Sequence, residues 1–510
     1  MDERKETVTG TGAPHWSLKY ELVVGLEVHA QLITKSKAYS NDPNAYGDHP
    51  NTNVSVITLG HPGTLPVANK KVIELAVRMG LVTNCTIAPW MHYARKNYFY
   101  PDLPKGYQIT QDHTPICTQG YVEIPRTTEA GDHGKDGQGS SGMTRIGITR
   151  IHMEEDAGKS IHDVDPFNTL VDLNRAGVPL IEIVSEPDIR SAQEAYDYLV
   201  EIRRLVRYLD ICDGNMEEGS LRCDANISLR PIGSTTFGTR CEVKNMNSFR
   251  NVMRAIEYEA QRQSELLDAG GTISMETRTF DAAKGSTLGM RSKELAHDYR
   301  YFPEPDLQPL HVSEAMKEAI RKEMPPLPRE LRAKYTTTLG LTAYDAGILT
   351  DDKATALYYE GVIAHTSNYK GAANWVMGDV RSWMNERGLE MQDFPISAAR
   401  LAGLINLIDS GQVSHSTASQ KLFPLMLENS EASAAELAAK HDLVQATDEG
   451  LIESIMQQAM ATYPDKVQAY RGGNKGLLGL FMGEVMKGTK GKADPKRANE
   501  VVRRILEQIP

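Results

Sequence analysis

The stretch ELVVGLEVHAQL, residues 21–32, alternates apolar and polar side chains with the two-residue period of a β-strand. One face is apolar and the other polar: Leu22, Val24, Leu26 and Val28 against Val23, Gly25, Glu27, His29 and Gln31. Glu27 and His29 therefore point the same way, which suits two ligands of one cation, or equally the solvated face of a surface strand. This half-buried strand predicts a sheet with one face against a core.

Two further runs carry acids among alternating apolar residues. Asp224 lies in SLRCDANISLR (residues 220–230), and Glu242 lies in TRCEVKN (residues 239–245). A hairpin between the runs is expected to place Asp224 roughly opposite Glu242 on the polar face. Like charges in that position need a cation, which is either a basic side chain (Lys244 or Arg222) or a bound metal.

The run HMEEDAGKS, residues 152–160, places three consecutive acids at the end of a strand, followed by Gly-Lys. Carboxylate oxygens suit Mg²⁺, which usually accompanies a nucleotide phosphate. The run lacks the spacing of a P-loop, and strand parity does not decide whether Glu154 or Glu155 faces the other acids.

The run RKNYFYPDLPKGYQ, residues 95–108, interleaves basic and aromatic side chains, a mixture that holds a nucleotide or an RNA end. An interface loop has the same composition. Residues 126–145 are hydrophilic and predict a surface loop; its Gly139–Gly142 segment is similar to that of amidase-signature enzymes but lacks the apolar framework that a nucleophile needs.

The rest of the chain predicts an α+β protein. Strand-like text between residues 20 and 308 is interrupted by two helices, one from Ser191 with a capping box to Glu194, the other over residues 248–267. The Pro-rich MPPLPREL (residues 324–331) precedes helical periodicity almost to the end. We expect an antiparallel-sheet cradle with flanking helices at residues 18–312, after a disordered leader at 1–17. A helical domain at 313–435 and a small helical tail at 436–510 follow.

Composition limits the class of protein. The chain has 510 residues, a net charge of −11, and no apolar run near the ~20 residues that a membrane helix requires. It has no secretory signal. Its five cysteines include no C-x-x-C pair, which favours the reducing cytoplasm. Cys223 and Cys241 fall on the apolar faces of their predicted strands, so we expect them in the core. Residues 466–510 hold ten basic and four acidic residues, a net of +6, so the remainder carries −17. A basic tail on an acidic body suggests polyanion binding or chance.

Ordered blocks across nearly the whole chain resemble the B subunit of the tRNA-dependent amidotransferase (GatB). These blocks are GLEVHAQL, RKNYFYPDLPKGYQI, HMEEDAGKS, DLNRAGVPLIEIVSEPDIRS, MEEGSLRCDANISLRP, EVKNMNSF, DYRYFPEPD, NWVMGDV and GKADPKRAN. The resemblance implies a cytoplasmic ligase that works in a heterotrimer with the glutaminase (the A subunit) and the C subunit. Such a protein uses ATP and Mg²⁺ to phosphorylate the side-chain carboxylate of Glu-tRNA(Gln) or Asp-tRNA(Asn), and channelled ammonia then yields the amide. Neither DNA nor a membrane is expected as a partner.

The resemblance also implies roles for particular residues. The implied metal ligands are Glu27, His29, Glu155, Asp224 and Glu242. Lys96 and Lys105 match positions that gate the ammonia channel together with Glu155, which makes these three the catalytic candidates. The candidates for contacts with phosphate or the tRNA end are Lys159, Arg291, Lys293 and Arg300, and those for the tRNA body are Lys487, Lys490, Lys492 and Lys496.

Two departures from the family accompany this resemblance. Some members carry a four-cysteine zinc knuckle after the first strand, but residues 36–60 contain no cysteine here, so we expect no zinc. The 126–145 insertion has no recognisable counterpart. Two rival interpretations stay open: a non-catalytic tRNA-binding scaffold, and a free-standing carboxylate–amine ligase acting on a small metabolite.

Overall fold

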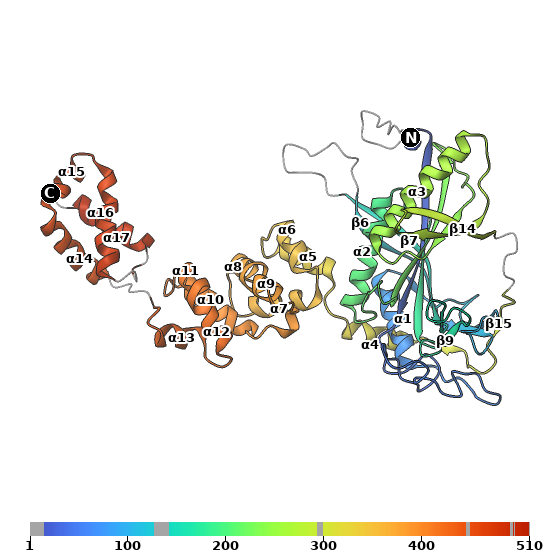
Figure 1. Cartoon of the computed structure of the whole chain (residues 1–510). Coiled ribbons are helices and arrows are strands. Elements are labelled where there is room, and N and C mark those ends of the chain that lie inside the picture. Colours follow the sequence, from blue (N-terminus) through green and yellow to red (C-terminus); the bar gives the residue numbers. More distant parts are fainter. Residues whose placement is uncertain are drawn as a thin grey trace. The chain divides into compact units, whose positions relative to one another are not determined.

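The computed structural model describes residues 15–126, 142–292, 299–444, 449–489, 493 and 495–508. Contacts divide the chain into two compact units, Met1–Pro325 and Pro326–Pro510 (Figure 1). The division lies inside the Pro-rich stretch. Most of the predicted leader and of the 126–145 loop, including Gly139–Ser141, lies outside the described residues; His15–Leu18 forms a 3₁₀ turn, η1.

A nine-stranded sheet forms the first unit, in the order β14-β13-β12-β11-β1-β10-β7-β6-β2. The strands are β1 (Tyr20–Gln31), β2 (Thr86–Ile87), β6 (Cys117–Pro125), β7 (Met143–Glu155), β10 (Pro179–Ser185), β11 (Leu221–Pro231), β12 (Cys241–Lys244), β13 (Glu276–Asp281) and β14 (Ser286–Ser292). All neighbours pair antiparallel except β12 and β13, which pair parallel. The predicted sheet is therefore confirmed, with one parallel pair added.

Strand β1 has the alternation that its sequence predicts. Leu22, Val24, Leu26 and Val28 are buried, whereas Glu27 and His29 are partly exposed on the other side. Three helices cover the sheet's apolar side: α1 (Lys70–Val82), α2 (Ala192–Tyr208) and α3 (Phe249–Asp268). Ser191 caps α2 and Ser248 caps α3, each by accepting a backbone N–H bond, so both predicted helix starts are confirmed.

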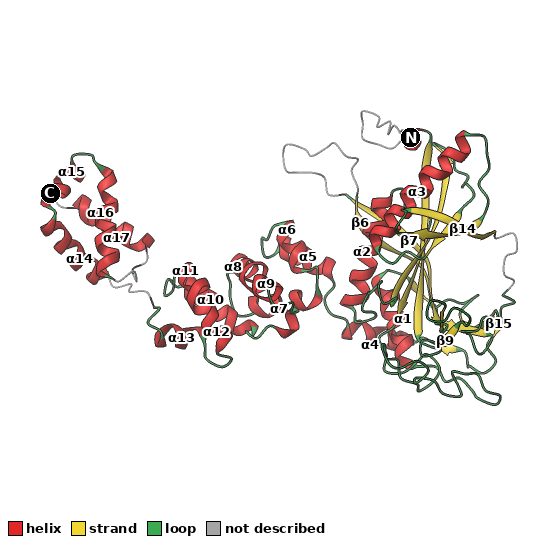
Figure 2. Ribbon diagram, viewed as in Figure 1, coloured by secondary structure: helices red, strands yellow, loops and turns green. Residues whose placement is uncertain are grey.

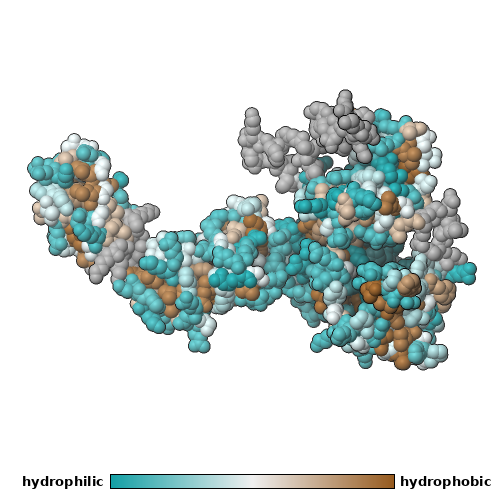
Figure 3. Space-filling model, viewed as in Figure 1, coloured by the Kyte–Doolittle hydropathy of each residue, from teal (hydrophilic) through white to brown (hydrophobic). Residues whose placement is uncertain are grey.

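Smaller elements surround one end of the large sheet. They comprise the sheet β15-β4-β5 (Phe302–Pro303, Ala94–Asn97 and Tyr107–Thr110), the pair β16-β3 (Leu310–His311 and Trp90–Met91) and the hairpin β8-β9 (Lys159–Ile161 and Leu170–Asp172). The first unit also includes α4 (Glu314–Glu323), which packs against α1 beyond the predicted boundary at residue 312. Figure 3 shows apolar residues gathered near β9, and Val164, Phe167 and Leu170 of that hairpin region are exposed.

The second unit is helical in its described part (Figure 2). Its earlier elements are α5 (Pro328–Thr337), α6 (Ala343–Leu349), α7 (Lys353–Ile363), α8 (Tyr369–Trp375), η2 (Val376–Val380), α9 (Arg381–Asn385), η3 (Met391–Asp393), α10 (Ala398–Asp409), α11 (His415–Thr417), η4 (Ala418–Leu422), α12 (Phe423–Glu428) and α13 (Ala434–Lys440). Then follow α14 (Glu449–Thr462), α15 (Pro464–Arg471), η5 (Lys475–Leu477), α16 (Leu478–Gly488) and α17 (Pro495–Gln508), which share one core cluster that includes Ile452, Phe481 and Val502.

Candidate active site

Three acids meet on the polar face where β1, β11 and β12 lie side by side. Glu27 pairs directly with Asp224 across β1 and β11. Glu242 pairs with Asn226, two residues from Asp224, so Asp224 and Glu242 are diagonal neighbours on this face and not direct partners. The three side chains nevertheless converge, because one oxygen of each carboxylate lies within 4.8 Å of the others. We call these three residues the first acidic cluster.

A single lysine contacts two acids of the first acidic cluster. Lys244 Nζ pairs with Asp224 Oδ2 and lies 3.2 Å from Glu242 Oε1. Although burial lowers the pKa of Lys244, the two carboxylates outweigh burial and raise it, so the lysine stays protonated. Arg222, the other candidate cation, instead binds Asp156 at 2.9 Å. One ammonium among three carboxylates leaves an excess of negative charge, which favours a cation.

Glu27 carries the electrostatic cost of this arrangement. Burial raises its pKa, and the charges of Glu182, Asp224 and Glu242 raise it further. Its Oε1 accepts a 2.9 Å hydrogen bond from Asn226 Nδ2, which fixes the carboxylate's direction. Oxygen donors held in this way, with their charge only partly compensated, match the preference of Mg²⁺.

A second acidic cluster, defined by His152, Glu154 and Glu182, lies on the neighbouring strands β7 and β10. Ligand atoms of these three residues also lie within 4.8 Å of one another. His29 joins them, with its Nε2 3.2 Å from Glu182 Oε2, and His152 Nε2 lies 3.5 Å from the same oxygen. His29 thus lies between the two clusters, on the same side of β1 as Glu27.

His29 and Lys96 flank the two carboxylates of the second acidic cluster. Burial raises the pKa of Glu182, but His152 and His29 outweigh burial and hold it well below its usual range. Burial lowers the pKa of His152, whereas for His29 the bond to Glu182 outweighs burial and raises the pKa. Lys96 Nζ lies 3.5 Å from Glu154 Oε2. Nitrogen and oxygen donors here could hold a second divalent ion.

Glu155 lies apart from the other implied metal ligands. Successive residues of a strand point to opposite sides, and His152 and Glu154 occupy the side of the acidic clusters. Glu155 instead pairs with Lys105, and its Oε1 accepts a 2.8 Å bond from the Ile109 N–H. The structure therefore brings Lys105 to Glu155 but Lys96 to Glu154.

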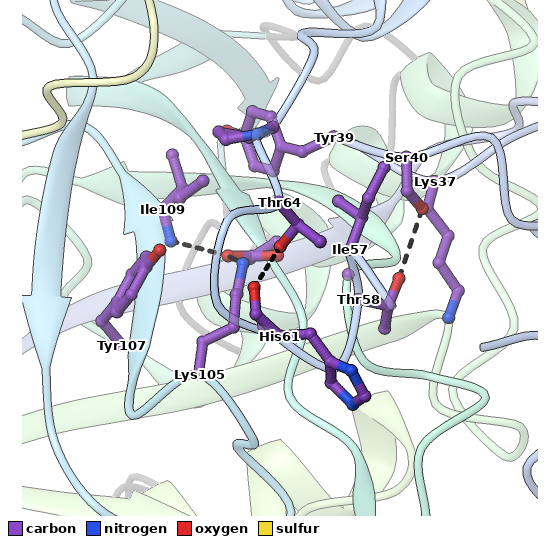
Figure 4. Close-up of a pocket in the computed structure, with 14 residues that line it drawn as sticks. Lys37, Tyr39, Ser40, Ile57, Thr58, His61, Thr64, Lys105, Tyr107 and Ile109 are labelled. Carbon is purple, nitrogen blue, oxygen red and sulfur yellow. Dashed lines mark hydrogen bonds and ion pairs between the residues drawn. The ribbon is translucent and has the colours of Figure 1, made fainter. Parts of the chain in front are cut away.

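The Lys105–Glu155 pair lines a cavity of about 160 Å³ (Figure 4). Lys105, Tyr107 and Ile109 lie on one side of it, and Ser40 and Thr58 lie on the other. The lining also includes Lys37, a fully buried side chain whose pKa burial lowers to about 8. This small cavity, with both a cation and an anion in its wall, fits a small polar molecule.

A larger cavity, of about 550 Å³, opens beside Glu27. Its walls come from β1, β7, β10 and β11 and from the segment 237–240, with Arg150, Ser185, Phe237 and Arg240 among the lining residues. Gly238 allows this segment to approach β11, because a Cβ there would lie 2.0 Å from the Leu229 carbonyl oxygen. The cavity's volume and mixed lining suit a nucleotide.

The remaining predicted residues are scattered. Lys159 is exposed on β8, and Arg300 is exposed with a positive φ of 44°. The backbone of Arg291 pairs with Thr277 in the sheet, and Lys487 is exposed near the end of α16. The side chains that lie outside the described part are those of Arg291, Lys293, Lys490, Lys492 and Lys496.

Sequence reasoning named Lys244 as a candidate partner of these acids but missed Glu182 and His152 as parts of the site. Glu182 is the lone acid in the apolar run PLIEIVS, residues 179–185, and that is a usable signal because a buried strand rarely keeps an unpaired charge. Its partners come from two other strands, so their identity depends on the pairing of β10.

Comparisons with known proteins identify the family. A family profile described as the GatB/GatE catalytic domain matches residues 22–318, and the GatB domain profile matches residues 357–506. Within the residues that the structure describes, none of the helices has both the length and the apolar character to span a bilayer.

Curated relatives agree over nearly the full length. The B subunit of the aspartyl/glutamyl-tRNA(Asn/Gln) amidotransferase of Pelodictyon phaeoclathratiforme is 50% identical over 490 residues, covering 96% of this chain and 100% of that protein. The proteins of the same name from Syntrophotalea carbinolica and Synechococcus sp. (strain JA-3-3Ab) are each 49% identical, covering 96% of this chain and 99% and 98% of theirs. The chain therefore belongs to the GatB family of amidotransferase B subunits.

Proposed function

We propose that this chain is the component of a tRNA-dependent amidotransferase that activates and amidates the aminoacyl group. ATP phosphorylates the side-chain carboxylate of Glu-tRNA(Gln), Asp-tRNA(Asn) or both, and ammonia displaces the phosphate to give the amide. The observation that carries the proposal is the pair of acidic clusters on one sheet face, beside a cavity of about 550 Å³. Such a site suits the joining of two anions, a phosphate and a carboxylate.

The first acidic cluster and His29 are the residues that would hold Mg²⁺, and the ion would screen the negative charge of the nucleotide's phosphates. Asn226 and Thr277 orient two of the carboxylates through hydrogen bonds of 2.9 Å each, to Glu27 and Glu242. Arg150 and Arg240 line the same cavity and offer positive charge to the phosphates. Lys96, beside Glu154, offers positive charge to the substrate carboxylate.

The reaction consists of two substitutions, each of which forms one bond and breaks one. A carboxylate oxygen attacks the γ-phosphorus and ADP leaves; ammonia then attacks the acyl carbon, phosphate leaves and one proton is released. The Lys105–Glu155 pair, with its cavity of about 160 Å³, supplies a polar path for ammonia, and the Glu155 carboxylate can accept the released proton. Glutaminase residues are not recognisable in this chain, so the ammonia comes from a glutaminase partner, the A subunit, in a heterotrimer completed by the C subunit.

The test uses the reconstituted three-subunit complex with each misacylated tRNA. We expect Asp224→Asn and Glu27→Gln to lower tRNA-dependent ATP hydrolysis roughly 100-fold while leaving tRNA binding within about twofold. Glu21→Gln is the matched control, since Glu21 lies on the same strand and contacts Arg230 at the surface.

Each rival interpretation predicts a different result. If the chain is a non-catalytic scaffold, any tRNA-dependent ATP hydrolysis by the complex should be the same in these variants as in the wild type. A free-standing ligase for a small metabolite would work without tRNA or the partner proteins, with free ammonia as donor. Comparison of Glu-tRNA(Gln) with Asp-tRNA(Asn) in the same assay identifies the substrate.

A further inference from the structure

Four aromatic side chains gather beside Lys96 and the second acidic cluster. They are Tyr98 and Tyr100, which follow β4, and Tyr299 and Tyr301, which precede β15; we call them the aromatic rim. The rings form an edge-to-face chain, Tyr100–Tyr98–Tyr299–Tyr301, with centroid separations of 5.8, 6.0 and 5.9 Å. Segments about 200 residues apart in sequence thus build one surface.

Polar contacts hold the two halves of the aromatic rim together. Arg95 binds Glu304 through two hydrogen bonds of 2.6 and 2.8 Å, and its guanidinium stacks 4.2 Å from the Tyr107 ring centroid. Asn97 Nδ2 donates to the Arg300 carbonyl at 2.8 Å. Glu304 is almost fully buried, so the pairing with Arg95 is shielded from solvent and fixes the path of residues 299–306 over β4.

Lys96 connects the aromatic rim to the acids. Its ammonium lies 5.3 Å from the Tyr299 ring centroid and 3.5 Å from Glu154 Oε2. The ammonium is held between an aromatic ring and a carboxylate. Lys96 therefore connects the aromatic rim directly to the second acidic cluster.

Both end rings of the aromatic rim are exposed, Tyr100 at 49% and Tyr301 at 41%. Exposed aromatic rings clustered beside fixed cations are typical of surfaces on which nucleic-acid bases stack. The neighbouring basic residue Arg300 is exposed as well, which matches a polyanion better than an apolar protein face.

We propose that the aromatic rim is a stacking platform for the unpaired 3′-terminal bases of the aminoacyl-tRNA. The inference rests on the proposed function, since the esterified amino acid lies only a few bonds from the terminal base. With that base held on the rim, the amino acid's side-chain carboxylate extends past Lys96 toward the acidic clusters. The rim therefore positions the substrate and takes no part in the bonds that change.

The experiment compares two tRNAs in the full three-subunit complex, one intact and one without its 3′-terminal nucleotides. Tyr301→Leu and Tyr100→Leu are expected to weaken binding of the intact tRNA about tenfold and to leave binding of the shortened tRNA unchanged. Tyr301→Phe, which keeps the ring, is expected to bind as the wild type does. Tyr46→Leu is the control, because Tyr46 is 75% exposed but lies outside the rim.

A second readout reports stacking directly. A fluorescent 2-aminopurine at the 3′ end should be quenched on binding to the wild-type complex and Tyr301→Phe, and should stay bright with Tyr301→Leu. Equal loss of affinity for both tRNAs, unchanged quenching, or loss of complex assembly in the variants would overturn the inference; the last result would assign the rim to a protein partner. Failure of the proposed function looks different, because wild-type complex would then show no tRNA-dependent ATP hydrolysis.

Discussion

At the residue scale, Glu27 is held in an environment that disfavours its charge. Its pKa is raised by burial and by three nearby carboxylates, so its ionised form destabilises the fold above the pKa of an ordinary glutamate. We predict that Glu27→Gln stabilises the metal-free protein by about 0.5–2 kcal/mol while removing activity. The gain should be small near the ordinary pKa of a glutamate and grow as the pH rises, because only ionised Glu27 is penalised. Thermal melts in EDTA at pH 5 and pH 8 check this; a variant less stable than wild type at pH 8 would contradict it.

Lys244 has the opposite effect, since it is the basic side chain that pairs with Asp224 and Glu242. We predict that Lys244→Met destabilises the metal-free protein by about 1–2 kcal/mol, because it leaves two partly buried carboxylates uncompensated while solvent screens part of their charge. Millimolar Mg²⁺ should restore part of that loss. Urea unfolding with and without Mg²⁺ measures both effects, with Lys284→Met, at an exposed surface pair with Asp281, as the control.

Sequence alone could predict the polar face of single strands but not how strands combine. The alternation of apolar and polar residues in β1 and β11 correctly predicted that Glu27, His29 and Asp224 lie on the side away from the core. The prediction works because a strand with one buried face can turn only its apolar residues toward the core. Glu242 lies opposite Asn226 and not Asp224, a shift of two residues that the sequence could not predict because a long turn separates β11 from the short β12. The resemblance places Glu155 among the metal ligands, whereas the structure places it beside Lys105.

At the element scale, the loop of residues 36–60 depends on one buried carboxylate. Asp42 Oδ2 accepts bonds of 2.9 Å from both the N–H and the hydroxyl of Ser55, and another from Thr58. Two residues further on, Gly60 packs so closely against Lys105 that a Cβ would lie 2.7 Å from its Cγ. The Asp42 clamp thus holds the wall of the Lys105–Glu155 cavity. The absence of cysteines in this loop is plain from the sequence, but the clamp is not, because it joins side chains far apart in the loop.

We predict that Asp42→Ala destabilises this loop by about 1–3 kcal/mol. Burial raises the pKa of Asp42, but its hydrogen bonds outweigh burial and lower the pKa. The clamp's contribution to stability is therefore fully present above the pKa of an ordinary aspartate, and it is lost as the pH falls through the lowered pKa. Hydrogen exchange of the Ser55 amide measures the effect, and Asp48→Ala, which removes a bond to Asn53 in the same loop, is the control. Equal protection of Ser55 in both variants would contradict the prediction.

At the scale of the whole molecule, the structure refines where the basic tail can be removed. The net charge of +6 lies in residues 466–510, but a cut at 466 would strip α14 of its partners, because Ile452 and Met456 of α14 are buried against α16 and α17. A cut after Val444 removes α14–α17 together, so the core that they share is removed whole.

We predict that a complex with the chain ended at residue 444 still hydrolyses ATP when misacylated tRNA is saturating, but binds tRNA at least tenfold more weakly. Its affinity should also depend less steeply on salt concentration, because each lost phosphate contact removes about one unit from the slope of log affinity against log salt concentration. Titrations of tRNA at several salt concentrations check this, with circular dichroism to confirm that the shortened chain is folded. Undiminished affinity with an unchanged salt slope would show that residues 1–444 bind the tRNA by themselves and that the tail's charge does not contribute to binding.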